Sequence, residues 1–225
     1  MALKMTRPLV LIPTEMELAA LRSSCGRVFA AADVAVEICG FGPIAATAKT
    51  SLLLGQYRPA HVFLLGIAGT YSERLAVASA YCFEQVACYG VGVGAGDSYR
   101  TGQELGWSPA DQACFGLSLP ESIGTHETAD MLLTACAASA DQRDIDGKLT
   151  KFPVAEAEDM EGYGVAAACA AYNIPCTVVR GISNHCGDRN HQNWQTANAL
   201  AAVGELAERL LAEFGSTNSS GGQRS

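Results

Sequence analysis

The chain has 225 residues, of which 49% are hydrophobic, and its 15 basic and 23 acidic residues give a formal net charge of −8. A chain of this length and apolar content can bury one sizeable core, so a single domain is expected. The sequence has no cluster of lysines and arginines that would follow a phosphate backbone. The composition therefore argues against nucleic acid and against an anionic membrane surface as partners.

The nine cysteines are scattered without a C-x-x-C pair, and most of them lie in apolar runs. This is typical of small core residues in a reducing compartment rather than of a disulfide or zinc framework. The four histidines also lack metal-ligand spacing, so no metal site is predicted. The apolar stretch near the N-terminus is too short for a signal peptide, and no run is long enough to span a bilayer. A cytoplasmic protein is the simplest expectation.

The first half of the chain alternates short apolar runs, typical of buried strands, with helical patterns. Leu9–Ile12 is expected to form a strand, and Thr14 can cap a helix that reaches about Ser24. Further along, the patterns predict strands at Val28–Ala31 and Val34–Cys39, a helix at Pro43–Gln56, and strands at His61–Gly66 and Ser79–Tyr89.

The second half continues the same alternation. The patterns predict a strand at Leu132–Ala137, a helix from about Ser139 to Lys151, a short segment at Val154–Glu158, an Ala-rich helix from Met160 to about Asn173, a strand at Cys176–Val179 and a last helix at Asn193–Phe214. This order predicts one domain over residues 1–214, a three-layer α/β sandwich around a mostly parallel sheet. Residues 215–225 are Gly/Ser-rich and are expected to form a disordered tail.

A glycine-rich segment, residues 90–96, satisfies a loose form of the dinucleotide-binding pattern, with Asp111 about where a ribose-binding acid would fall. That pattern needs a helix opening on the glycines. The residues that follow carry Gly102, Gly106 and Pro109 and show no apolar stripe at helical spacing. The segment is therefore not expected to bind a dinucleotide, and it is either a loop over a pocket or a surface loop.

Polar side chains gather after the expected strand at Cys176–Val179, where a plain core would have none. They include Arg180, Asn184 and Asp188, and Glu161 opens the preceding helix. Because ligands of open α/β sheets bind beyond the carboxyl ends of strands, a functional site is predicted here. Two plainer interpretations stay open: Glu161 can be a first-turn acid that complements the helix dipole, and Asp188 can be a turn residue.

Four ordered motifs span nearly the whole chain up to the tail. They are Pro13-Thr14 with Glu17; Gly66-Ile67-Ala68-Gly69; Phe152-Pro153 followed by Glu158-Asp159-Met160-Glu161-Gly162; and Arg180-Gly181-Ile182-Ser183-Asn184 with Gly187-Asp188-Arg189 and Trp194. Together they resemble the nucleoside phosphorylase/nucleosidase superfamily, and within it the futalosine hydrolases of the menaquinone pathway. The resemblance implies a twisted mixed sheet, cleavage or phosphorolysis of the N-glycosidic bond of purine nucleosides, no metal or organic cofactor, and assembly into homo-oligomers.

The resemblance also implies roles for individual residues. Glu161 would accept hydrogen bonds from the ribose 2′- and 3′-hydroxyls, with Met160 packed on the sugar, and its carboxylate would favour positive charge on the ring. Glu17 would orient or deprotonate the attacking water, although an ordinary exposed helix glutamate is the alternative. The turn that holds Ala68 and Gly69 would bring backbone close to the sugar and the nucleophile.

Asn184 bears on the choice of base. Methylthioadenosine/adenosylhomocysteine nucleosidases carry an aspartate at the matching position, whose protonated form donates to N7 and suits a 6-amino purine. An asparagine offers a donor and an acceptor and suits a 6-oxopurine, so hypoxanthine is the expected leaving base and futalosine the expected substrate. Asp188 is a candidate proton source, or else it holds the loop.

Ala138 and Ser139 match the substrate-binding positions where those nucleosidases stack an aromatic ring on the purine. Stacking must therefore come from elsewhere, and Tyr99 and Tyr163 are candidates that can equally be packing residues.

Three alternatives to a futalosine hydrolase remain. A methylthioadenosine/adenosylhomocysteine nucleosidase is one, and a non-enzymatic nucleoside-binding protein is another. A purine nucleoside phosphorylase, the third, needs groups for phosphate early in the chain, and Arg22, Arg27 and Arg180 are the nearby candidates. A carboxylate such as Glu17 near the nucleophile would repel phosphate and favours water.

Overall fold

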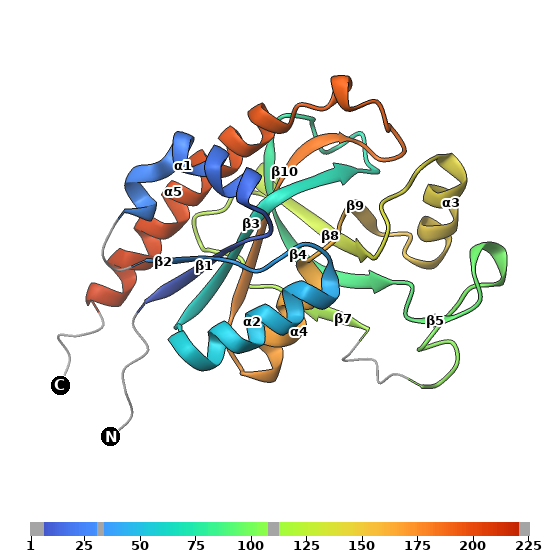
Figure 1. The fold of residues 1–225 in the computed structure, drawn as a ribbon, viewed down its shortest axis with the longest axis horizontal. Helices are drawn as coiled ribbons and strands as arrows, with labels where there is room; N and C mark the ends of the chain where they lie inside the picture. Colours follow the sequence, from blue (N-terminus) through green and yellow to red (C-terminus); the bar gives the residue numbers. More distant parts are fainter. Residues whose placement is uncertain (1–6, 31–33, 108–112, 221–225) are drawn as a thin grey trace.

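The computed structural model describes residues 7–30, 34–107 and 113–220. An eight-stranded mixed sheet forms the centre, with helices on both sides of it (Figure 1). Its strands are β1 (Pro8–Ile12), β2 (Ala35–Ile38), β3 (His61–Thr70), β4 (Ala80–Tyr89), β7 (Cys114–Gly116), β8 (Thr128–Ala135), β9 (Ala155–Asp159) and β10 (Cys176–His185). The pairs β1–β2, β1–β3, β3–β10, β4–β8 and β8–β9 are parallel, and β4–β10, β3–β9 and β4–β7 are antiparallel. The expected α/β architecture on a mixed sheet is confirmed.

The sheet closes on itself, which the sequence does not predict. Strands follow the order β10-β4-β8-β9-β3, and β10 pairs with β3 as well, so these five strands form a ring to which β1 and β2 are added. At one end of the ring, Gly69 of β3 pairs with Glu158 of β9 on one side and with Asn184 of β10 on the other. Three segments that are distant in the sequence therefore meet at one point.

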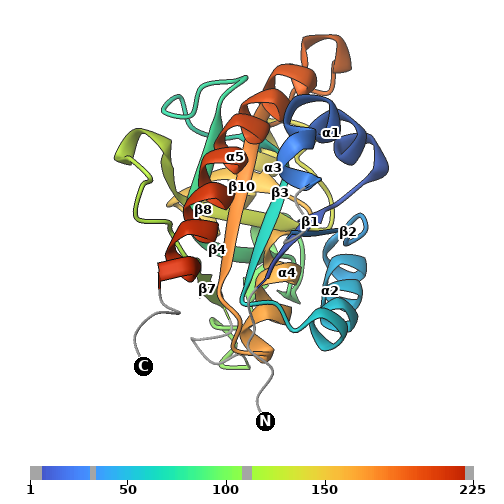
Figure 2. The same ribbon diagram turned by 90° about the vertical axis from the view of Figure 1, so that its left-hand side faces the viewer.

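Each face of the sheet has its own pair of helices. Helices α1 (Glu15–Phe29) and α5 (Thr196–Ser220) pack on each other and cover one face, and Figure 2 shows α5 lying along β10 and β3. Helices α2 (Pro43–Tyr57) and α4 (Gly162–Ala171) cover the other face, and α3 (Gln142–Lys151) lies to the side (Figure 1).

The side chains of β1 explain why both faces are covered. Leu9 and Leu11 belong to the core under α2 and α4, whereas Val10 and Ile12 belong to the core under α1 and α5. Successive side chains of a strand point to opposite faces, so a continuous apolar run needs cover on both.

Several expected boundaries are wrong. Helix α1 continues to Phe29, so the strand expected at Val28–Ala31 is helical at its first two residues, and its last residue lies outside the described residues. Helix α3 begins at Gln142 rather than near Ser139, because the side chain of Asp141 caps it by accepting a hydrogen bond from the Asp144 N–H at 3.1 Å. Helix α5 continues to Ser220, so residues 215–220 are helix and not the expected tail, while residues 221–225 lie outside the described part.

Strand β10 is much longer than its apolar run. It extends to His185, so Arg180, Ser183 and Asn184 lie within the strand and not beyond it. Pairing with β3 on one side and β4 on the other supplies the backbone hydrogen bonds that keep this polar part extended.

The glycine-rich segment has no helix behind it. It leads into a small hairpin of β5 (Gly92–Val93) and β6 (Arg100–Thr101), joined through a short 3-10 turn, and this hairpin does not line the main cavity (Figure 1). The segment does border other hollows, because Val91 and Thr101 line a cavity of about 370 Å³ and Ala95 and Gly96 line a further one, so both interpretations stay open. Asp111, the candidate ribose acid of that pattern, lies outside the described residues. No helix of the described ranges combines the length and the apolar character needed to cross a membrane.

Helices α4 and α2 approach each other closely at Gly164. A Cβ atom there would overlap the Pro43 carbonyl oxygen and lie 2.6 Å from Thr47 Oγ1. We expect Gly164→Ala to lower the free energy of unfolding by about 1–3 kcal/mol, the range for overpacked sites. The control is Gly147→Ala in α3, where a Cβ meets nothing within 4 Å; it should raise that free energy by about 0.5–1 kcal/mol. Urea denaturation measures both, and an unchanged midpoint for Gly164→Ala would contradict the close packing.

Candidate active site

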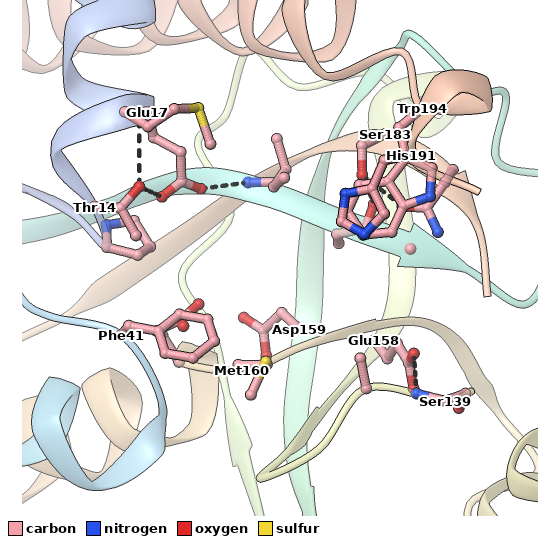
Figure 3. Close-up of a pocket in the computed structure, with 18 of the residues that line it drawn as sticks. Thr14, Glu17, Phe41, Ser139, Glu158, Asp159, Met160, Ser183, His191 and Trp194 are labelled. Atoms are coloured by element: carbon pink, nitrogen blue, oxygen red, sulfur yellow. Dashed lines mark hydrogen bonds between the residues drawn. The ribbon is translucent and has the colours of Figure 1, made fainter. Parts of the chain in front are cut away.

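A cavity of about 350 Å³ opens where β1, β3, β9 and β10 end (Figure 3). Every predicted site residue except Asp188 lines it: Glu17, Ala68, Gly69, Ala138, Ser139, Met160, Glu161 and Asn184. Strands β1, β3 and β10 run parallel to one another, so their carboxyl ends lie at the same edge, which is where ligands of such sheets bind. Among the described residues no three histidine, cysteine or acidic side chains are grouped as a metal site.

Glu17 is fixed at the start of α1 with its carboxylate in the cavity wall. It accepts hydrogen bonds from Thr14 Oγ1 at 2.6 Å and from the Ile67 N–H at 3.1 Å (Figure 3), and only 4% of the residue is exposed. The alternative of an ordinary exposed helix glutamate is therefore wrong. Two neutral donors on one carboxylate hold it in a single orientation toward the cavity.

Glu161 precedes α4, yet its side chain makes no capping bond to that helix. It accepts a hydrogen bond from the Gly42 N–H at 3.0 Å and lies 3.4 Å from Arg180 Nη2. Burial raises the pKa of Glu161 to about 7; the positive charge of Arg180 opposes this rise, and the negative charge of Asp159 adds to it. The plain interpretation of Glu161 as a helix-terminus acid is thus not supported by its contacts.

Arg180 is completely buried between these acids. Its Nε and Nη2 donate to Asp159 Oδ2 at 3.0 and 2.6 Å, whereas its Nη1 has no hydrogen-bond partner in the described part of the chain. Nη1 lies against Gly66, and a Cβ on that glycine would overlap it and would lie 2.9 Å from Glu17 Oε1. Only a residue without a side chain lets the guanidinium and Glu17 approach each other here.

None of the three arginines that were candidates for binding phosphate is found in the described lining of this cavity. Arg180 donates to Asp159 through Nε and Nη2 and does not line the cavity, and Arg22 is exposed and does not line it either. The side chain of Arg27 lies outside the described residues. Sequence reasoning missed Asp159, which also accepts hydrogen bonds from Thr134 Oγ1 at 2.6 Å and from the Gly162 N–H at 2.8 Å. An aspartate that is directly followed by Met160 and Glu161 gave no separate signal.

The side-chain amide of Asn184 is oriented by its own strand. Ser183 Oγ donates to Asn184 Oδ1 at 2.7 Å, and Asn184 Nδ2 donates to the His185 carbonyl oxygen at 2.8 Å. An amide nitrogen carries two hydrogens, so one remains for a ligand. Asn184 lines the cavity, and an amide donor does not depend on pH.

Asp188 lies outside the cavity lining. Its carboxylate accepts hydrogen bonds from the Asn190 N–H and from Asn193 Nδ2, both at 2.9 Å, and its carbonyl oxygen accepts one from Trp194 Nε1 at 2.9 Å. These contacts match the interpretation of Asp188 as a residue that holds the loop. A proton-donor role for it gains no support from its position.

That loop supplies the aromatic part of the cavity wall. His191 stacks on Trp194 with ring centres 4.4 Å apart (Figure 3). The Arg189 guanidinium lies 5.4 Å from the centre of the Trp194 ring. The tyrosines considered for base stacking do not line the cavity, because Tyr99 packs on Tyr89 and Tyr163 packs on Phe115. Both tyrosines are therefore packing residues rather than residues that stack on the base.

The comparisons agree with this architecture. The family model for the phosphorylase superfamily matches residues 4–214, and the chain belongs to this superfamily. A 5′-methylthioadenosine/S-adenosylhomocysteine nucleosidase of Colwellia psychrerythraea is 25% identical over 186 residues, which are 76% of this chain and 74% of that protein. A futalosine hydrolase of Streptomyces coelicolor is 27% identical over 183 residues, 76% of this chain and 75% of that protein. The crystal structure of a nucleosidase from Helicobacter pylori superimposes with a TM-score of 0.77 at 16% identity, covering 94% of this chain and 100% of that one, which shows the fold.

The raised pKa of Glu161 can be measured directly. We expect its carboxyl group to titrate near pH 7, protonated below and ionised above that value, because burial disfavours the charged form. Carbon-13 NMR of protein labelled at glutamate carboxyls follows this, and Glu161→Gln identifies the signal by removing it. A midpoint near 4.5, the ordinary glutamate value, would contradict the buried environment described here.

Proposed function

We propose that this protein hydrolyses the N-glycosidic bond of futalosine and releases hypoxanthine and dehypoxanthine futalosine, in the futalosine route to menaquinone. The family and its named relatives support the general reaction, which is hydrolysis of an N-glycosidic bond by a nucleosidase. The choice of futalosine as the substrate rests on the amide of Asn184, which lies in the cavity wall, is held in one orientation and is a neutral donor at every pH.

Breaking the bond between ribose and base develops positive charge on the sugar and negative charge on the base. Glu161 stabilises the sugar: its carboxylate accepts from the ribose hydroxyls, and Met160, which lines the same wall, packs on the ring. Because only the ionised carboxylate favours a cationic sugar, kcat/KM falls as the pH drops through about 7, the pKa of Glu161.

The nucleophile is water, held by Glu17. Its carboxylate is already oriented by Thr14 and Ile67, and the unpaired Arg180 Nη1 beside it is a buried donor that lacks a partner. A buried donor without a hydrogen bond costs about 1–3 kcal/mol, which a water molecule between the two side chains removes. Phosphate is disfavoured in the same place, because Glu17, Asp159 and Glu161 all line the cavity as acids.

The charges at the rim of the cavity favour futalosine over methylthioadenosine. In the described part of the lining, Arg189 is the one lysine or arginine, and no acidic side chain pairs with it. Futalosine carries a carboxyphenyl group, whereas the methylthio group of methylthioadenosine is neutral. Arg189 and Trp194 provide a cation and an aromatic face for such a group.

The protein is proposed to assemble as a homo-oligomer, a dimer or larger. Phe41, 65% exposed, lies at the cavity, and Ile44 and Leu52 of the adjoining α2 are 81% and 63% exposed. Large exposed apolar side chains from one short stretch of the chain are typical of a contact between chains.

A nucleoside panel tests the proposed reaction. We expect purified protein to release hypoxanthine and a reducing sugar from futalosine in phosphate-free buffer, and to act faster on futalosine than on methylthioadenosine. The variant Glu161→Gln tests whether the reaction takes place in this cavity. It should lower turnover by about two orders of magnitude, which is the usual effect of removing one preorganised charged group. A strict requirement for phosphate would identify a phosphorylase instead. A faster reaction with methylthioadenosine would identify the nucleosidase that most of the named relatives are.

Asn184→Asp tests the choice of base. We expect the ratio of kcat/KM for inosine over that for adenosine to fall by about tenfold or more, because the second oxygen of a carboxyl group that donates to N7 accepts from the 6-amino group of adenine but opposes O6 of hypoxanthine. Ser183→Ala is the matched control: it removes the hydroxyl that orients the amide but keeps the amide, so the ratio should fall less. An unchanged ratio in Asn184→Asp would mean that Asn184 only fastens the end of β10.

A further inference from the structure

Glu158 is a buried acid of the cavity that the proposed mechanism does not use. It lies at the end of β9, lines the cavity, and is paired through Gly69 with the strand position of Asn184. Figure 3 shows it beside Ser139 at the opposite side of the cavity from Glu17. In the proposed reaction the ribose and the nucleophile lie on the side of Glu17, so Glu158 faces the part of the cavity that remains for the base.

Four hydrogen bonds fix the carboxylate of Glu158. Oε2 accepts from Lys148 Nζ at 2.7 Å, from Ser139 Oγ at 2.8 Å and from Tyr71 Oη at 2.6 Å, and Oε1 accepts from the Ser139 N–H at 2.7 Å. Lys148 is itself buried and uses its other hydrogens on Ser139 Oγ and on the Ala137 carbonyl oxygen. Oε2 is therefore saturated, whereas Oε1 has a lone pair for a further donor.

This carboxylate is held in its ionised form. Burial raises the pKa of Glu158, but the charge of Lys148 and the hydrogen bonds from Lys148, Tyr71 and Ser139 outweigh burial and bring the pKa below its ordinary value. An ionised carboxylate accepts hydrogen bonds and donates none. The wall opposite Asn184 is thus a fixed acceptor.

We propose that Glu158 selects the base by accepting a hydrogen bond from N1–H of a 6-oxopurine. This inference rests on the proposed function, since it names the residue that recognises the base in that reaction. A 6-oxopurine presents the acceptor O6 next to the donor N1–H, and the cavity presents the donor Asn184 and the acceptor Glu158. Adenine has no hydrogen on N1, so its N1 lone pair would face the carboxylate and leave two acceptors opposed.

The thiol of Cys186 is the other group on this carboxylate. Its pKa is raised, chiefly by burial and next by the negative charge of Glu158. A thiol is a weak donor, so it leaves the carboxylate a good acceptor for a purine N–H. Cys186 does not line the cavity, so it does not take the space of a bound base.

Binding of free bases tests Glu158 without relying on turnover. Calorimetry with the full chain compares hypoxanthine, 1-methylhypoxanthine, which lacks the N1 hydrogen, and adenine. We expect hypoxanthine to bind at least about tenfold more tightly than the other two, the scale of one hydrogen bond to a charged group. In Glu158→Gln, whose amide can also donate to N1 of adenine, the preference for hypoxanthine over adenine should shrink to about threefold or less.

Glu156→Gln is the matched control, because Glu156 lies on the same strand, pairs with Arg74 and does not line the cavity. It should keep the preference of the unaltered protein. Where Glu158→Gln does not fold, the comparison of the three bases on the unaltered protein decides alone. Equal binding of hypoxanthine and 1-methylhypoxanthine, or an undiminished preference in folded Glu158→Gln, overturns the role of Glu158. If Glu158 fails this test but the protein hydrolyses futalosine, the proposed function stands without this role. If the protein prefers hypoxanthine as described but hydrolyses no futalosine, the proposed function is rejected and the role of Glu158 stands.

Discussion

The completely buried guanidinium of Arg180 is the constraint on which the site depends. A charge inside a protein core needs opposite charge and hydrogen bonds close by, since an unpaired one is strongly destabilising. Asp159 makes both direct bonds, Glu161 lies 3.4 Å away, and Glu17 approaches across Gly66. These acids come from the end of β9, the start of α4 and the first turn of α1. The same charge balance that stabilises the core therefore assembles the acids that the chemistry uses.

The closed ring of strands explains why these segments can meet. Because β3 pairs with β1, β9 and β10, its end lies among the ends of the strands that carry or precede the reactive residues. Gly69 stands between Glu158 and Asn184, and a Cβ there would lie 3.0 Å from Cys186 Sγ. A glycine at this position leaves room for the side chain of Cys186 beside the strand.

Two buried glutamates three residues apart have opposite pKa shifts. Burial dominates at Glu161, whose pKa rises to about 7, because Arg180 is already bonded to Asp159. At Glu158 the neighbouring Lys148 outweighs burial and the pKa falls. Environments that separate the pKa values of similar groups commonly assign them different roles. Here one carboxylate faces the charge that develops on the sugar, and the other is a permanent acceptor for the base.

The sequence by itself determined the alternation of strands and helices, the family motifs and most of the cavity lining, because apolar periodicity and motif order are local properties of the chain. It could not give the length of β10, whose polar end at Asn184 and His185 is held extended by pairing with β3. Nor could it tell that Glu17 is buried, that Asp188 holds a loop, or that Arg180 is tied to Asp159 and does not line the cavity. Only the tertiary structure decided these points, since the burial and the partners of a charged side chain depend on segments far away in the sequence.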